Sequence, residues 1–287
     1  MKSNSLLVTI AIPIYNAEKY LDYAIISVIN QTFDSWELLL MEDGSSDNSP
    51  QIAQAYAEKD KRIKVISDGQ NKGLIARLNQ SVSLANGKYY ARMDADDIMV
   101  ITRIEQQVTF LEAHTNVDVI GSSTMLIDGD NQIIGSRSMK DNYTSFIHPS
   151  VMGKTEWFKA NLYSFDAYRV EDKDLWYRTS HKSTFYNLEQ PLMFYRAFGS
   201  STSVQTFKSN QRQRKLFKKY KQYEKSLIWC VKNTLMSYVK DVVFFIMPLL
   251  GGDKFFGFIR KRHPVPAELH LTNEDLLKSI AHEKSID

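Results

Sequence analysis

A chain of 287 residues has the length of one large domain, or of one domain with an appendage. Hydrophobic residues make up 43% of it and charged residues 24%, as in a globular protein with a core, and the single cysteine, Cys230, excludes a disulfide framework and a cysteine zinc cluster. The net charge of +3 is uneven, because residues 201–287 hold 16 Lys and Arg against 8 Asp and Glu. This asymmetry predicts an enzyme-like body with a basic tail.

The amino terminus carries Lys2 and an apolar run over residues 6–14. A signal peptide starts in a similar way, but the residues from Pro13 to Glu18 interrupt the run and no small-residue cleavage site follows. We therefore expect a buried first strand and a protein that is not secreted.

Strands and helices alternate four times in the first hundred residues. Apolar runs predict strands at 6–12, 36–41, 62–66 and 89–93. Apolar residues at helical spacing predict helices at 17–29, 50–58 and 74–85, the first of them capped by Asn16. This alternation is typical of βαβ units and of a mainly parallel sheet.

Two predicted strands end in acidic residues. The fourth runs into Asp94–Asp97 and the second into Asp43–Asp47. The carboxyl ends of parallel strands meet at one rim, where such sheets bind ligands. Neighbouring carboxylates repel unless a cation lies between them, and hard oxygen ligands suit Mg2+ or Mn2+. The pair of motifs predicts a nucleotide site, in which one carboxylate binds the ribose or base and the other group binds a metal at the diphosphate. The alternatives are that these acids only form turns or, for Asp97, that it caps the next helix.

Further motifs follow in a fixed order. They are Ile12–Asn16, Trp36–Glu37 with Asp43–Asp47, Asn71–Gly73 with Leu78–Asn79, Ala85–Tyr89, Met93–Asp97, Arg103, His148–Ser150 and Glu171–Trp176. The series covers about residues 5–200 and resembles the family 2 glycosyltransferases, which adopt the A-type glycosyltransferase fold. The resemblance implies a mainly parallel central sheet flanked by helices, a nucleotide-sugar donor, Mn2+ or Mg2+, and transfer with inversion at the anomeric carbon.

The resemblance also implies residues for the donor and the metal. Asp96 is expected to bind the metal and Asp94 the metal or the ribose. The expected contacts of the nucleotide sugar are Pro13, Tyr15, Asp43, Arg77, Asp94 and Ala95. Two alternatives remain open, in which Tyr15 is a packed aromatic side chain and Arg77 forms a surface salt bridge.

On the acceptor side, the resemblance puts the general base at Asp172. From the residues alone, Glu171 or Asp174 could serve equally, or all these acids could simply favour a helix N-terminus. His148, Glu171 and Trp176 are expected to line the acceptor site, with a structural role as the alternative for His148. Arg196 is expected either near the diphosphate or as a solvated strand-end arginine.

Between these motifs the sequence predicts a strand over 117–121, a hairpin turn at 128–131 and a mobile polar loop over 137–145. The loop is short for the family, so an open acceptor side is expected.

The tail combines basic and apolar segments. Residues 208–225 hold eight Lys and Arg and one acid at spacing that predicts a basic amphipathic helix, and apolar runs follow at 227–231 and 242–250. Neither run reaches the ~18 uncharged residues of a spanning helix. We expect a catalytic domain over 1–205 and a helical extension over 206–287 that contacts a membrane surface through residues 208–260. Nucleic-acid binding and a helical subdomain packed on the body are the alternatives.

These features together predict a metal-dependent inverting hexosyltransferase. It would move a sugar from a UDP-sugar to a lipid-linked saccharide acceptor in surface polysaccharide biosynthesis, of the O-antigen or capsule type. We expect it at the cytoplasmic face of the bacterial inner membrane as a peripheral protein, without a nucleic-acid partner. The alternatives are a soluble transferase acting on a protein or small glycoside, and a non-catalytic nucleotide-sugar-binding protein.

Overall fold

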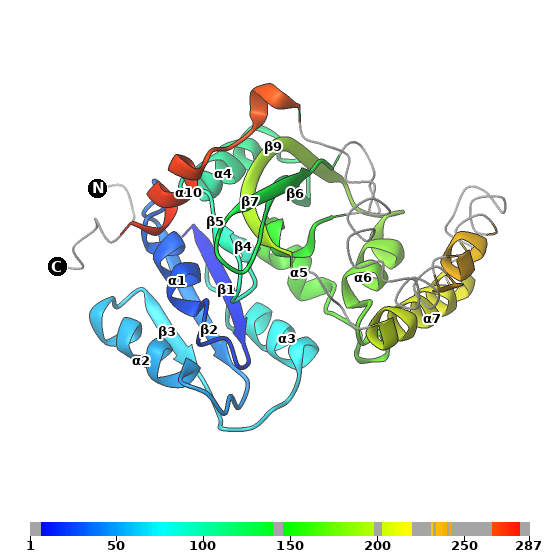
Figure 1. The fold of residues 1–287 in the computed structure, drawn as a ribbon, viewed down its shortest axis with the longest axis horizontal. Coiled ribbons are helices and arrows are strands. Elements are labelled where there is room, and N and C mark those ends of the chain that lie inside the picture. The colour runs from blue at the N-terminus through cyan, green and yellow to red at the C-terminus, as the bar shows by residue number, and fades with distance from the viewer. Residues whose placement is uncertain are drawn as a thin grey trace.

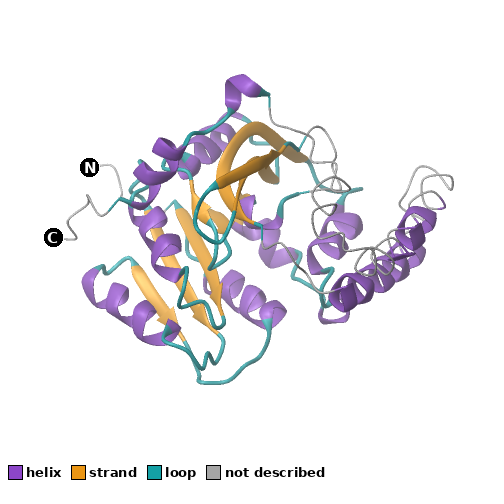
Figure 2. Cartoon of the chain, in the orientation of Figure 1, coloured by secondary structure: helices purple, strands orange, loops and turns teal. Residues whose placement is uncertain are grey.

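One sheet with helices on both faces forms the body of the protein (Figures 1 and 2). The computed structural model describes residues 7–139, 146–197, 203–219, 231, 234–239, 241–242 and 266–281. In sheet order the strands are β3 (Ile63–Ile66), β2 (Trp36–Glu42), β1 (Val8–Ile14), β4 (Tyr89–Arg92), β8 (Met152–Lys154), β6 (Val119–Ile127), β9 (Phe185–Arg196) and β5 (Ile98–Met99), with β7 (Ile133–Arg137) paired to β6.

The first four strands of this order run parallel to one another. β1 pairs with β2 and β4, β2 pairs with β3, and β6 pairs in parallel with β9, while β8, β5 and β7 are antiparallel to their neighbours. The prediction of a mainly parallel sheet is therefore confirmed. The predicted hairpin is also confirmed, because β6 and β7 pair across the turn in which Asn131 has a φ of 61°.

Helices cover both faces of the sheet, which explains the continuous apolar strands. Ile10 and Ile12 of β1 belong to one buried cluster and Ala11, between them, belongs to another. The helices are α1 (Leu21–Ile29), α2 (Ser49–Lys59), α3 (Leu74–Leu84), α4 (Arg103–Ala113), α5 (Thr155–Ala160), α6 (Glu171–Thr179), α7 (Ser203–Lys219) and α10 (Asn273–Ile280).

One local prediction, the helix cap at Asn16, is wrong, and so is the alternative of a helix cap at Asp97. Asn16 does not cap a helix, because α1 begins only at Leu21 and Asn16 has a φ of 51°. Asp97 does not cap a helix either, because β5 follows it and its Oδ1 accepts a hydrogen bond from the backbone N–H of Arg196 at 2.8 Å. Both residues lie in the loops that build the rim of the sheet.

The basic tail is helical in its described part up to residue 242. α7 covers the first part of the predicted amphipathic helix, and its Leu216 packs in a buried cluster with Ala167, Val170 and Tyr177. The predicted segments 220–225, 227–230 and 243–250 lie outside the described residues, as does most of the expected membrane contact up to residue 260. None of the helices in the described ranges has the length and apolarity that crossing a membrane requires. The boundary at residues 205 and 206 stays a prediction.

The last helix returns to the body. Thr272 and Asp275 form a capping box at the start of α10, and Leu276 is buried against β5. Asn30, after α1, holds the other end, because its Nδ2 donates to the carbonyls of Ser279 at 3.2 Å and Ala281 at 2.7 Å.

We expect Asn30→Ala to lower the free energy of unfolding by about 1–2 kcal/mol, because two hydrogen bonds at a buried site are lost. Urea titration followed by circular dichroism measures this. The control is Ser83→Ala, which removes one exposed hydrogen bond to the carbonyl of Gln80 and should change little. Equal midpoints for the two variants would show that the contact does not hold α10.

Candidate active site

A cavity of about 760 Å³ lies where β1, β2 and β4 end. Its wall comes from the loop after β1, the start of α3, the turn after β4 and the residues just before α6. The sequence-predicted residues that line it are Pro13, Tyr15, Asp43, Arg77, Asp94, Ala95, Asp96 and Glu171. Chain segments more than 150 residues apart thus meet at one cavity.

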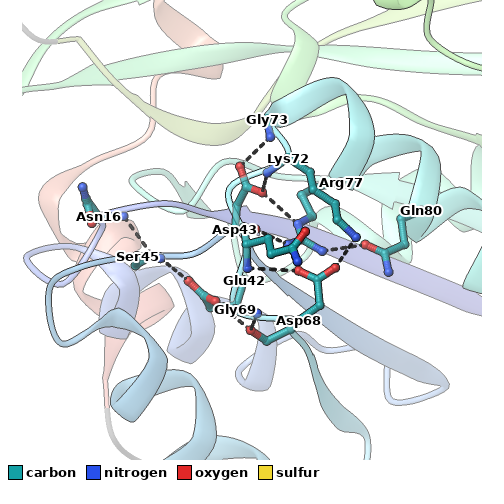
Figure 3. A network of polar contacts seen from close by, with 12 residues as sticks. Asn16, Glu42, Asp43, Ser45, Asp68, Gly69, Lys72, Gly73, Arg77 and Gln80 are labelled. Atoms are coloured by element: carbon teal, nitrogen blue, oxygen red, sulfur yellow. Dashed lines mark hydrogen bonds and ion pairs between the residues drawn. The ribbon is translucent and has the colours of Figure 1, made fainter.

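Asp43 is fixed at the end of β2 by three donors (Figure 3). The backbone N–H groups of Lys72 and Gly73 donate to its two oxygens at 2.7 and 2.9 Å, and Nε of Arg77 donates to Oδ1 at 2.9 Å. Arg77 has no exposed surface and also pairs with Asp68 at 2.7 Å, so it is not the surface salt bridge of the alternative prediction. It orients Asp43 from behind while lining the cavity.

The turn after β2 is clamped to the loop after β1. The backbone N–H of Asn16 donates to Ser45 at 3.1 Å, and the side-chain oxygen of Asn16 accepts from the backbone N–H of Ser46 at 2.8 Å. Gly44 has a φ of +70°, and a Cβ there would lie 2.8 Å from the backbone nitrogen of Asn71. Beside this clamp, Tyr15 lines the cavity and is 55% exposed, so it is not a packed aromatic residue.

Three carboxylates gather after β4. Oxygen atoms of Asp94, Asp96 and Asp97 lie within 4.8 Å of one another. Burial and the charge of Asp94 raise the pKa of Asp96 to about 6 and raise that of Asp97. Asp97 is 1% exposed, and its Oδ2 has no hydrogen-bond partner in the described part of the chain. Such a set of hard oxygen donors fits a divalent cation of the Mg2+ or Mn2+ type.

Arg92 is a site residue that the sequence prediction missed. It is 2% exposed, and one guanidinium nitrogen donates to Oδ1 of Asp94. Burial disfavours its charge, but the surrounding acidic groups, with Asp94 the strongest of them, together outweigh burial and raise the pKa of Arg92. Its Nε and Nη1 are buried without a partner among the described residues. The signal was an arginine inside an otherwise apolar strand, two residues before Asp94.

The acids of the predicted base lie in the first turn of α6. Glu171 lines the cavity, is 9% exposed, and its Oε2 has no partner within the described ranges; burial raises its pKa. Asp172 is half-buried and does not line the cavity as described. Asp174 is buried in an ion pair with Arg178 at 3.1 Å, which removes it as a candidate base.

His148 lies edge-on to Trp176 of α6, with 6.3 Å between the two ring centroids, in a group of buried aromatic side chains. Nε2 of His148 is 2.8 Å from the hydroxyl of Tyr163, and burial lowers the pKa of His148 well below its usual value. Trp176 is 1% exposed and packs edge-on against Phe146 and Phe185. Neither is among the described lining residues of the cavity, so each shapes this side from the interior.

Arg196 is neither solvated nor aimed at the cavity. It is 3% exposed, its Nε donates to the carbonyl of Asp96 at 2.7 Å, and Nη2 donates to Asn131 at 2.6 Å. Its guanidinium also lies 4.0 Å from the ring of Tyr20. It ties the acidic turn to the β6–β7 hairpin.

We expect Glu171→Gln to raise the melting temperature above neutral pH by roughly 1–4 °C and to change it little near pH 4. The pKa of Glu171 is raised in the folded protein, so its ionised form destabilises the fold above that pKa, and its protonated form does not below it. Calorimetry at the two pH values measures this. The control is the exposed Glu156→Gln; a stabilisation that does not depend on pH would contradict the burial argument.

The family model described as Glycosyl transferase family 2 matches residues 9–187. An uncharacterized glycosyltransferase of Haemophilus influenzae is 32% identical over 235 residues, which are 74% of this chain and 72% of the relative. Among solved structures, residues 1–349 of S. aureus TarS in complex with UDP-GlcNAc have a TM-score of 0.62 and 15% sequence identity to this chain. The match covers 84% of this chain and 72% of that TarS chain. In the match to the TarS complex with UDP, this chain spans 65% of the TarS chain. The mannosyltransferase PcManGT of Pyrobaculum calidifontis, in complex with GDP-Man and Mn2+, has a TM-score of 0.60 at 12% identity over 95% of this chain and 85% of PcManGT.

Proposed function

This chain belongs to glycosyl transferase family 2 and has the A-type glycosyltransferase fold, and from that premise we propose that it moves a hexosyl unit from a UDP-sugar to a lipid-linked saccharide with inversion. One observation carries the proposal: the cavity at the ends of β1, β2 and β4 combines the fixed Asp43 with the cluster of Asp94, Asp96 and Asp97. This is a polar nucleotide-binding end beside a site for a cation.

The donor lies along the cavity in this proposal. Asp43, held by Arg77, accepts hydrogen bonds from the ribose or the base, and exposed Tyr15 lies against the base. Pro13 and Ala95 complete the wall around the nucleotide. The complexes of TarS with UDP and UDP-GlcNAc support uridine, whereas the GDP-Man of PcManGT makes guanosine the competing base.

Asp94 and Asp96 would hold Mn2+ or Mg2+, with Asp97 directly behind them. The bound cation supplies charge stabilisation for the departing diphosphate. Arg92 keeps Asp94 in place by its hydrogen bond, so the carboxylate is oriented before the donor arrives.

Asp172 accepts the proton of the acceptor hydroxyl as that oxygen attacks the anomeric carbon opposite the leaving group. Glu171, on the cavity wall, contacts the acceptor side, and His148 and Trp176 support that wall from behind. The acceptor is a lipid-linked saccharide of surface polysaccharide assembly. We place the enzyme at the cytoplasmic face of the bacterial inner membrane as a peripheral protein, since α7 carries six basic residues and no acidic one.

The proposal is tested by incubating the purified protein with a panel of UDP-, dTDP- and GDP-sugars in Mn2+, Mg2+ or EDTA. We expect slow release of the nucleoside diphosphate from one UDP-sugar, dependent on the metal. Release from a GDP-sugar alone would overturn the assignment of uridine, and release unchanged in EDTA would overturn the metal. Absence of both hydrolysis and thermal shift with every donor would favour a non-catalytic site.

A further inference from the structure

A short helical segment that follows α7 in the chain packs against α7 through its polar face. We call residues 234–239 and 241–242 the outer helix. Arg214 of α7 donates to the hydroxyl of Ser237 at 3.0 Å and pairs with Asp241 at 2.5 Å, and Nδ2 of Asn210 donates to Asp241 at 2.7 Å. Ser237 and Asp241 are four residues apart and so share one face of the helix. Figure 1 shows this segment in orange beside α7.

The outer helix leaves its apolar residues in solvent. Leu235, Val239 and Val242 follow the i, i+4, i+7 spacing of one helical stripe and are 64%, 48% and 55% exposed. Met236 and Tyr238 beside them are also about half exposed. A packed surface helix normally buries its apolar stripe and exposes its polar face. The outer helix does the reverse, and within the described ranges its stripe stays open to an apolar partner.

The charge of α7, the helix that the outer helix contacts, indicates the kind of partner. α7 carries six Lys and Arg and no Asp or Glu, and Lys208, Lys215 and Lys218 are exposed. Exposed aliphatic side chains beside lysines are typical of segments that lie in the interface of an anionic bilayer. A nucleic acid would match the lysines but not the aliphatic stripe.

This surface is connected directly to the cavity. Leu216 of α7 packs on Ala167 and Val170, just before α6. Arg212 donates to the carbonyl of Tyr168 at 2.9 Å, and its guanidinium lies 4.8 Å from the ring of Tyr168, which lines the cavity. A partner bound to the outer helix and α7 therefore lies beside one rim of the active site.

We propose that the outer helix and the lysines of α7 form a membrane-docking surface that holds the mouth of the cavity at an anionic lipid bilayer. The inference rests on the proposed function, because a lipid-linked saccharide would be presented at that surface. The stripe enters the boundary between headgroups and acyl chains, and the lysines contact the lipid phosphates.

Flotation of the full chain with vesicles tests the proposal. The vesicles are phosphatidylcholine mixed with phosphatidylglycerol, or phosphatidylcholine alone. We expect binding to the mixed vesicles that weakens as salt is added. Leu235→Ser with Val239→Ser should weaken it roughly tenfold or more, because two apolar side chains no longer enter the lipid. The matched control is Leu84→Ser with Leu277→Ser, which replaces two exposed aliphatic side chains of α3 and α10 by serine.

Wild-type protein that does not float with mixed vesicles would overturn the proposal, as would equal binding by the two double variants. Light scattering that shows a dimer lost only in the Leu235/Val239 variant would overturn it in favour of a protein interface. Donor hydrolysis in solution, measured on the same samples, reports the proposed function separately. Hydrolysis without flotation rejects docking alone, and flotation without hydrolysis rejects the catalytic proposal alone.

Discussion

Replacing Asp96 by Asn should reduce turnover of the donor roughly 10³-fold, because a cation site worth several kcal/mol of charge stabilisation is lost. The affinity for Mn2+, measured by electron paramagnetic resonance without any donor, should fall with it. The same variant should be more heat-stable in EDTA above pH 6. Burial and the charge of Asp94 raise the pKa of Asp96 to about 6, so its ionised form destabilises the metal-free fold above that pH and the neutral amide does not.

The combination of lost metal binding and gained stability separates this effect from misfolding. The matched control is Asp130→Asn, an acid of the β6–β7 turn outside the cluster, which should leave both quantities unchanged. Unaltered Mn2+ affinity in the Asp96 variant would place the metal elsewhere in the protein.

The strands that position the site were predictable because each carries a local signal. β1, β2 and β4 are mainly apolar and end in polar turns, and the structure brings those turns to one cavity. Asp43 and Asp94 could thus be expected near each other, because each follows the carboxyl end of a strand in a parallel sheet.

The parts that were missed depend on contacts between distant residues. Asn16 is a residue type that often caps helices. In the structure its side-chain oxygen instead accepts a hydrogen bond from the backbone N–H of Ser46, thirty residues later, and its φ of 51° is left-handed. A helix cap at Asp97 was a reasonable alternative from the local sequence. No local pattern reveals that the backbone N–H of Arg196, at the end of β9, donates to the Asp97 carboxylate. Tertiary contacts overrode local preference at both positions.

Buried charge was the other gap. Nothing in the spacing of Arg77 or Arg92 distinguishes a buried orienting arginine from a solvated one, because the distinction comes from the elements that cover them. Both arginines lie behind a carboxylate of the cavity, Arg77 behind Asp43 and Arg92 behind Asp94. Arg92 lies two residues before its acid in the sequence, whereas Arg77 is 34 residues from Asp43, so sequence proximity could have indicated only Arg92.

Asp172→Asn should lower kcat about 10²–10⁴-fold and leave the KM for the donor and the affinity for the nucleoside diphosphate unchanged, because a general base acts on the acceptor hydroxyl and not on the donor. Steady-state kinetics with the donor found in the panel measure kcat and KM, and calorimetry measures nucleotide binding. Glu171→Gln, at the neighbouring position on the cavity wall, should cause a smaller loss.

The matched control is Asp166→Asn, which changes an exposed acid of the same segment and should behave as wild type. The comparison decides between the two acids of α6. Glu171 has the unpartnered oxygen and lines the cavity, whereas the proposed base, Asp172, is the more solvated of the two. If Glu171→Gln abolishes turnover while Asp172→Asn retains it, the base is Glu171, and the raised pKa of that carboxyl should then appear as the acidic limb of the pH–rate profile.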